Sequence, residues 1–242
     1  MTAQIIFGIH AVENAVKSGQ VTEVWILRES KNQRLNKLKQ LLDKSEVNSH
    51  WVAPADLDKL CTEKHQGVVA KVEHLQIHGE KQLKEQLDTW QNPLLLILDS
   101  IEDPRNLGAC LRSADAAGVT AVIITKNQSA PITAVTRTTA AGAVDNLNLF
   151  QVSNLARAIE TIKQAGVWVY GTDCSERSQS LFQTDLSGAV AIVMGNEGKG
   201  LRHLVKEKCD HLIHIPMAGE VQSLNVSVAT GVTLFEVLRQ RL

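Results

Sequence analysis

From Pro93 onward, short aliphatic runs alternate with longer stretches of helical pattern, and this alternation constrains the fold more than any other feature. The runs are LLLILD (94–99), AVIIT (121–125), VWVYGT (167–172), AIVMG (191–195) and HLIHIPM (211–217). Helical patterns cover residues 105–118, 154–166 and 226–242, and the first two end on glycine. Near-continuous aliphatic strands separated by helices are typical of a parallel sheet covered on both faces. We predict an α/β fold for residues 93–242.

The chain before Pro93 has a different pattern. Residues 1–74 contain apolar runs at 21–27 and 68–72 with helical patterns around them, which indicates a small α/β domain of its own. Residues 75–92 (LQIHGEKQLKEQLDTWQN) are polar and end before a proline. We therefore interpret 75–92 as a linker between a domain at 1–74 and a domain at 93–242.

Composition excludes several classes of protein. The 25 basic and 26 acidic residues give a net charge of -1, so the bulk charge points neither to nucleic acid nor to a membrane surface. The aliphatic run at 94–98 is far shorter than the roughly 20 residues of a membrane span, and no signal-peptide pattern opens the chain. We predict a cytoplasmic protein without a membrane partner.

The metal-binding residue types are scattered. The four cysteines, Cys61, Cys110, Cys174 and Cys209, show no C-x-x-C spacing, and we interpret them as reduced thiols. His211 and His214 are three residues apart in an expected strand, so their side chains would lie on opposite faces. We predict no metal site.

One helical segment, RESKNQRLNKLKQLL (28–42), carries the only notable basic cluster. Its cations are Arg28, Lys31, Arg34, Lys37 and Lys39, against the single anion Glu29. On spacing alone a solvated helix face is the favoured interpretation, and a surface that follows RNA phosphates is the alternative.

Three loops after expected strands carry unusual chemistry. In open parallel sheets, ligands collect at the carboxyl ends of the strands. The loop after 94–99 leads into a helix with Asn106 and Arg112, the loop after 191–195 is NEGKGLR with Glu197, and the loop after 211–217 holds Ser223 and Asn225. Neither G-x-G-x-x-G nor a P-loop is present. Any nucleotide-like cofactor would be held in another way.

Each of these residues also has an ordinary structural interpretation. Asn106 could be a helix N-cap, Ser223 and Asn225 could cap the last helix, and Glu197 could be an exposed turn residue. Arg112 could pair with Asp115 on the helix surface. Their coincidence at one edge of one sheet favours a functional site.

The sequences LDSIEDPRNLGACLRSADAAG, IVMGNEGKGLR and IPMAGEVQSLNVSVATGVTLFEVLR resemble the three signature motifs of the SpoU branch of the SPOUT methyltransferases. This family methylates ribose 2'-hydroxyls with S-adenosylmethionine. With FGIHAVENAV and HQGVVAKV, the resemblance covers nearly the whole chain, and it is closest to members that modify a guanosine of 23S ribosomal RNA near the peptidyl-transferase loop. It implies a C-terminal domain with a deep trefoil knot, an obligate homodimer formed near the cofactor site, and an N-terminal RNA-binding domain.

Residue roles follow from the same resemblance. It implies that the catalytic residues are Asn106, Arg112, Glu197, Ser223 and Asn225, that S-adenosylmethionine is held by the segments with Gly195, Ile215, Met217 and Leu224, and that ribosomal RNA is held by Arg28, Lys31, Arg34 and Lys37. Asn196, beside Glu197, stands at a variable position of the motif.

The chemistry suggests a role for the arginine. A guanidinium stays protonated in proteins, so it is a poor base. Our hypothesis is that Arg112 clamps the phosphate next to the target ribose and stabilises the developing alkoxide, while the proton passes to phosphate or water. Glu197 and Asn106 would orient Arg112 and the ribose.

Three other functions stay open at this point. The chain could be a ribose methyltransferase of transfer RNA, a non-catalytic dimeric RNA-binding protein on the same scaffold, or an enzyme of another α/β family that binds a phosphate ligand. The set of Asn106, Arg112, Glu197 and Asn225 argues against the last two.

Overall fold

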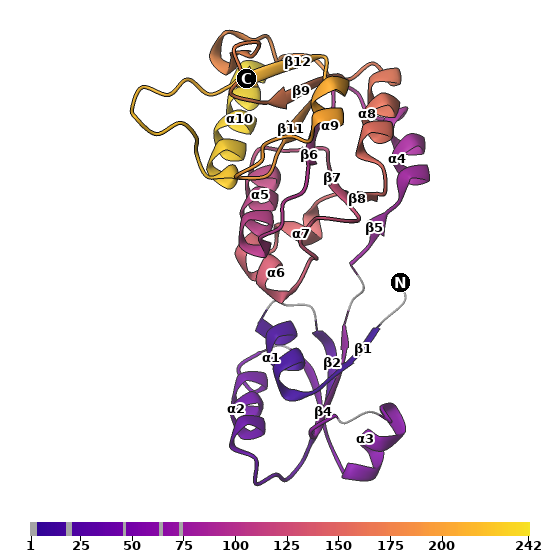
Figure 1. The fold of residues 1–242 in the computed structure, drawn as a ribbon. Coiled ribbons are helices and arrows are strands. Elements are labelled where there is room, and N and C mark those ends of the chain that lie inside the picture. The colour runs from indigo at the N-terminus through magenta and orange to yellow at the C-terminus, as the bar shows by residue number, and fades with distance from the viewer. Residues whose placement is uncertain (1–3, 18–20, 46, 63–64, 73–74) are drawn as a thin grey trace. The chain divides into compact units, whose positions relative to one another are not determined.

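The computed structural model describes residues 4–17, 21–45, 47–62, 65–72 and 75–242. The chain divides into two compact units, Met1–Leu75 and Gln76–Leu242 (Figure 1). In the described part of the chain, no helix combines the length and the apolar character needed to cross a membrane.

The first unit is a four-stranded sheet with helices. Its elements are β1 (Gln4–Phe7), α1 (Ile9–Lys17), β2 (Val21–Leu27), α2 (Gln33–Leu42), β3 (Asn48–Val52), α3 (Pro54–Leu60) and β4 (Val68–Val72). The strand order is β1-β4-β2-β3, with only the β2–β3 pair parallel. The strands predicted at 21–27 and 68–72 are β2 and β4. The core forms where Leu35, Leu38 and Leu42 of α2 pack with α1 and the central strands.

The second unit is built on an eight-stranded sheet. Its elements are β5 (Ile77–His78), α4 (Glu80–Leu87), β6 (Leu94–Leu98), α5 (Pro104–Ala116), β7 (Ala121–Thr125), α6 (Ala134–Ala140), α7 (Ala143–Asn146), β8 (Leu149–Val152), α8 (Leu155–Gln164), β9 (Trp168–Thr172), β10 (Gln179–Ser180), a short 3-10 turn (Leu181–Gln183), β11 (Val190–Met194), α9 (His203–Lys208), β12 (His211–His214) and α10 (Val226–Arg241). The strand order is β10-β12-β9-β11-β6-β7-β8-β5, and every pair is parallel. The predicted α/β fold with a parallel sheet is confirmed.

Two layers of helices cover this sheet. Helices α4, α8 and α9 pack on one face, where Leu95 and Ile97 of β6 contribute to a continuous apolar core. Helices α5 and α10 lie together on the other side (Figure 1). They contact each other closely: the Cys110 Sγ of α5 lies 3.4 Å from the Thr230 Oγ1 of α10, and a Cβ on Gly231 would lie 3.6 Å from the Ser113 Oγ. Both faces of every central strand are therefore buried, which explains the unbroken aliphatic runs.

The segment interpreted as a linker, residues 75–92, differs from that expectation. Residues 77–78 form β5 at the edge of the large sheet, and residues 80–87 form α4. Leu83 and Leu87, four residues apart, are buried in the core of the second unit. The polar composition reflects a helix with a single buried face, and the chain passes from the first compact unit to the second between residues 75 and 76.

Candidate functional site

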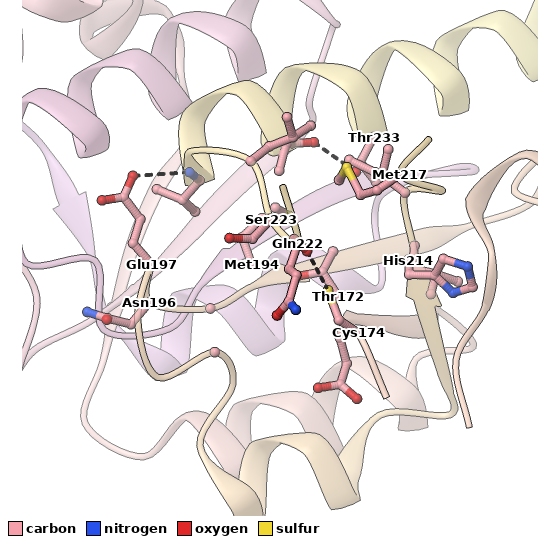
Figure 2. A pocket seen from close by; sticks show the side chains of 18 of the residues that line it. Thr172, Cys174, Met194, Asn196, Glu197, His214, Met217, Gln222, Ser223 and Thr233 are labelled. Carbon is pink, nitrogen blue, oxygen red and sulfur yellow. Dashed lines mark hydrogen bonds between the residues drawn. The ribbon is translucent and has the colours of Figure 1, made fainter. Parts of the chain in front are cut away.

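A pocket opens where β9, β11 and β12 end. Because these parallel strands run in one direction, the loops that follow them meet at the same edge of the sheet. The cavity has a volume of about 390 Å³. Glu197 lies toward one end and His214 toward the other, with Cys174 drawn between them (Figure 2). Its lining includes Ser223 and all four residues expected to hold the cofactor, Gly195, Ile215, Met217 and Leu224.

The loop after β11 folds back on itself through a close backbone contact. Asn196 and Gly200 exchange two backbone hydrogen bonds, of 3.1 and 2.9 Å, so that Glu197 stands in a tight turn. Gly195 is buried beneath this turn, where a Cβ would lie 2.5 Å from the backbone nitrogen of Leu201. The glycine is required because the returning strand of the turn leaves no room for a side chain.

Asn225 links three loops through its side-chain amide. The Nδ2 group donates one hydrogen bond to the Asn106 Oδ1, at 3.1 Å, and another to the Glu197 Oε1. The same Glu197 oxygen accepts a hydrogen bond from the backbone nitrogen of Val226, at 3.2 Å (Figure 2). The first turn of α5, the turn after β11 and the end of the loop after β12 therefore converge on one polar cluster beside the pocket, which Glu197 lines.

The helix caps decide between the two interpretations of the asparagines. Asp103, not Asn106, caps α5, because its carboxylate accepts hydrogen bonds from the backbone nitrogens of Arg105 and Asn106. The expectation that Asn106 caps this helix is therefore wrong, and its side chain is free to meet Asn225. Asn225 caps α10 with its Oδ1, which accepts from the Ser227 nitrogen at 2.9 Å, while its amide nitrogen makes the contacts between loops.

Arg112 lies apart from this cluster within the chain. It is exposed on α5, six residues and about 9 Å along the helix axis beyond Asn106. It is not part of the pocket lining. Among the described residues, Asp115 forms no ion pair with Arg112, and its carboxylate accepts a hydrogen bond from the Asn146 amide, at 3.4 Å. Across the described ranges of the chain, no side chain or backbone group forms a hydrogen bond or ion pair with the Arg112 guanidinium, so within one chain Glu197 and Asn106 do not orient it.

Several pocket residues escaped sequence reasoning. Thr172 ends β9 and Cys174 lies just after it. His214 ends β12, and its Nδ1 lies 2.9 Å from the Ser178 Oγ. The only signal was their position, because each stands at or just after the carboxyl end of a strand. No residue-type pattern separated them from ordinary loop residues.

The basic cluster is exposed on the first unit. Arg34 and Lys37 lie on α2, Lys31 precedes the helix, and Arg28 follows β2. Arg28 donates to the backbone oxygen of Trp51, at 3.4 Å, and the Arg34 Nη1 lies 3.4 Å from the His10 Nε2. Among the described residues, none of these four cations forms a salt bridge, so their charge is free to meet an anionic partner.

Lys39, the fifth cation of the segment, is occupied within the fold. Its Nζ donates to the backbone oxygen of Arg28, at 2.9 Å, and lies 5.6 Å from the centre of the Trp51 ring. Lys39 therefore connects the end of β2 with α2 and β3. The basic surface open to a ligand consists of the other four cations, Arg28, Lys31, Arg34 and Lys37.

Comparison with known proteins gives consistent matches for both units. Residues 93–235 match the SpoU rRNA Methylase family, and residues 5–78 match the family described as RNA 2'-O ribose methyltransferase substrate binding. The chain is 46% identical over 239 residues to the 23S rRNA (guanosine-2'-O-)-methyltransferase RlmB of Pseudomonas putida, covering 98% of this chain and 96% of that protein. It is 48% identical over 243 residues to the protein of the same name from Shewanella oneidensis, covering 98% and 97%.

Solved structures show the same architecture. The SpoU methyltransferase AviRb from Streptomyces viridochromogenes, in complex with AdoMet, matches with a TM-score of 0.66 at 25% identity, covering 99% of this chain and 90% of that one. An AdoMet-bound rRNA methyltransferase from Sinorhizobium meliloti matches with a TM-score of 0.68 at 25% identity, covering 99% and 88%.

Proposed function

Because this chain belongs to the SpoU rRNA methylase family, we propose that it transfers a methyl group from S-adenosylmethionine to the ribose 2'-hydroxyl of a guanosine in 23S ribosomal RNA, near the peptidyl-transferase loop and in the cytoplasm. The observation that carries this proposal is the convergence of Asn106, Glu197 and Asn225 beside the pocket. Three segments that are far apart in the sequence meet there. Side chains that only capped their own helices would not need to meet.

The pocket suits S-adenosylmethionine in size and lining. Its volume of about 390 Å³ is within the usual range of small-molecule sites, about 300–1,000 Å³. Apolar side chains such as Leu181 and Ile213 can cover a flat ring, and the backbone around Gly195 and Leu224 offers polar groups. When bound, S-adenosylmethionine supplies an electrophilic methyl group. The chain must then hold the ribose oxygen in line with that methyl.

Glu197, Asn106 and Asn225 would position the ribose. Glu197 Oε1 is occupied by the two donors from Asn225 and Val226, whereas within the described chain Oε2 accepts no hydrogen bond. A carboxylate oxygen held in this way can accept a hydrogen bond from a ribose hydroxyl and fix its direction. Ser223, exposed in the loop that lines the pocket, would complete this site. In these roles, each of the four side chains must keep its position for the ribose to be held in line with the methyl group.

Arg112 would act across a subunit boundary. The Arg112 guanidinium is exposed and has no partner in the described chain. The pocket lining, within the described residues, contains a cation, Lys199, but no guanidinium that could bind a phosphate with two hydrogen bonds. A homodimer in which α5 of one subunit faces the pocket of the other would supply it. Arg112 would then clamp the phosphate next to the target ribose and stabilise the alkoxide, with the proton passing to phosphate or water.

The surface around Arg112 supports such a dimer. On α10, which packs beside α5, Val228 and Phe235 are seven residues apart and are 51% and 48% exposed. Val221, in the loop before α10, is 68% exposed. These side chains extend from the loop before α10 along α10, which packs against the helix that carries Arg112. An apolar surface of this kind is typical of a protein interface.

The chain path after β12 suits the trefoil knot that we propose for this domain. The loop from residue 215 to residue 225 returns to the turn after β11. There Glu197 accepts a hydrogen bond from the backbone nitrogen of Val226, the first residue of α10. A knotted path would keep the two loops from separating, and the site would then be held by topology as well as by hydrogen bonds.

The first unit would hold the RNA through its exposed cations. Replacing Lys31, Arg34 and Lys37 together with alanine is expected to weaken RNA binding and to flatten the plot of log affinity against log salt concentration. We expect the magnitude of the slope to fall by roughly 0.7 to 0.9 for each phosphate that the variant no longer neutralises. Filter binding with a 23S fragment at several salt concentrations measures this slope.

The matched control replaces Lys59, Lys81 and Lys84, which are exposed on α3 and α4, with alanine. It removes the same charge from other surfaces, so its slope should stay near that of the wild type. If both triple variants give the same slope, the cations of α2 do not contact RNA phosphates, and α2 is a solvated helix face.

Cysteine labelling reports on occupancy of the pocket. Cys174 is exposed and lines the cavity, so saturating S-adenosylmethionine should slow its alkylation severalfold at neutral pH. Burial raises the pKa of the Cys110 thiol to about 11 and that of Cys209 to about 12, so these two stay protonated and unreactive with or without the cofactor. Cys61, in the first unit, serves as the internal control. Peptide mass spectrometry gives the four rates, and protection absent from Cys174 would place the cofactor elsewhere.

The proposed activity is tested by mapping ribose methylation in ribosomal RNA from cells with and without this gene. Mass spectrometry of nuclease digests should show one 2'-O-methylguanosine in 23S RNA that disappears with the gene. Loss of a ribose methyl group from transfer RNA instead would assign the enzyme to that substrate, and unchanged methylation of both RNAs would contradict the proposal.

A further inference from the structure

Hydrogen bonds join two loops of the site, the one after β6 and the one after β11. Asp99, the first residue after β6, is fully buried, and its carboxylate accepts hydrogen bonds from Nε and from the backbone nitrogen of Arg202, at 2.7 and 3.1 Å. Arg202 follows the Asn196–Gly200 turn that carries Glu197 and immediately precedes α9. A buried carboxylate is stable only with such partners, and here these bonds tie one loop to the other.

A second link joins the same loops on the other side of Glu197. The Asn196 Nδ2 donates to the backbone oxygen of Ser100, at 2.9 Å, while its Oδ1 accepts from the Gly198 nitrogen, at 3.1 Å. Ser100 has a positive φ of 62°, an uncommon conformation for a residue with a side chain. Such a conformation persists where its surroundings hold it, and here the Ser100 hydroxyl also donates to Asp99.

We infer that Asp99 is a positioning residue of the methyl-transfer site, acting through Arg202 to hold Glu197 at a fixed distance from Asn106. This inference rests on the proposed function. The turn with Glu197 is fastened on both flanks to the segment that leads into α5, and α5 carries Asn106. Asn225 can bond Asn106 and Glu197 at once only if these two loops keep their separation. Neither Asp99 nor Arg202 lines the pocket, so both act on the reaction through Glu197.

Replacing Asp99 with asparagine tests this role, because the shape is kept and the charge that holds Arg202 is lost. We expect kcat to fall by about 10- to 100-fold, the loss typical of a small misplacement of a reacting group. The KM for RNA and the Kd for S-adenosylmethionine should stay within about threefold, since neither ligand meets Asp99. An unchanged kcat would overturn the inference.

The control is an equivalent carboxylate elsewhere in the same unit. Asp210 also accepts a hydrogen bond from a backbone nitrogen, that of Val169 at 2.9 Å, and pairs with a cation, Lys163, at 2.7 Å. It lies at the amino ends of the strands, away from the pocket. Asp210→Asn should leave kcat unchanged, and an equal loss in this variant would show a general structural effect.

A double-mutant cycle separates positioning from folding. In a Glu197→Ala background there is no carboxylate to position, so adding Asp99→Asn should lower kcat no further. If the two losses multiply, Asp99 does not act through Glu197. Arg202→Lys, which keeps the charge but loses the guanidinium geometry, provides the same cycle where Asp99→Asn does not fold. If the wild-type protein transfers no methyl group, the proposed function itself is wrong. If the wild type is active but the two substitutions lower kcat independently, only the inference about Asp99 is wrong.

Discussion

An Arg112→Ala enzyme is expected to bind S-adenosylmethionine with an affinity within a few fold of the wild type and to lose methyl transfer by at least about 10²–10³-fold. The guanidinium is absent from the pocket lining of its own chain, which explains the intact cofactor affinity. Arg112 would supply the guanidinium that the pocket lining lacks, so its loss should reduce turnover. Single-turnover transfer of a labelled methyl group, with calorimetry for the cofactor, measures both quantities.

Two further variants sharpen this prediction. Arg112→Lys keeps the charge but loses the planar fork that binds a phosphate with two hydrogen bonds, so most of the loss should remain. Arg157→Ala removes an exposed arginine from α8, on the opposite face of the sheet, and should leave turnover near the wild-type value. Unchanged turnover in Arg112→Ala would remove Arg112 from the mechanism.

Glu197→Ala is expected to lower methyl transfer on the order of 10²-fold and also to destabilise the second unit. The substitution leaves the Asn225 amide and the Val226 backbone nitrogen without their acceptor. Because the Val226 residue is buried, the unfilled donor should cost about 1–3 kcal/mol of unfolding free energy. Denaturant unfolding and single-turnover kinetics measure the two effects separately.

Glu197→Gln separates the two roles of this side chain. The amide keeps one oxygen that can accept from Val226, so most of the stability should return, whereas the free carboxylate oxygen is lost and the rate should stay low. Glu207→Ala, an exposed glutamate of α9, is the control and should change neither quantity. Full activity in Glu197→Gln would show that the carboxylate has no part in the reaction.

The central strands were predictable because packing leaves a direct mark on sequence. The run at 121–125 matches β7 residue for residue, since a strand buried on both faces must be apolar throughout. Strand β8, at Leu149–Val152, was missed because its four residues include a glutamine, and β5 has only two residues. Short strands at or near a sheet edge carry too few residues for a period to be recognised.

The site was predictable in its residue types but not in its contacts. Strand order alone brings Asn106, Glu197 and Asn225 to one edge, but the bonds that join them depend on side-chain direction, which sequence spacing does not specify. The separation of Arg112 from this cluster was equally hidden, because spacing along α5 does not tell which contacts an exposed side chain makes. Asp99 was overlooked, since an acidic residue after a strand usually only begins a turn.

Mixing two inactive variants tests most directly whether Arg112 and Glu197 belong to one site. Arg112→Ala and Glu197→Ala subunits, unfolded together and refolded in equal amounts, should form mixed dimers in half of the molecules, each with one pocket that combines an intact Glu197 with an intact Arg112 from the partner. A site shared between two subunits predicts recovery of about a quarter of wild-type methyl transfer to 23S RNA. If the mixture forms mixed dimers and stays as inactive as its parents, Arg112 and Glu197 do not meet across a subunit boundary, and the proposed shared site is wrong.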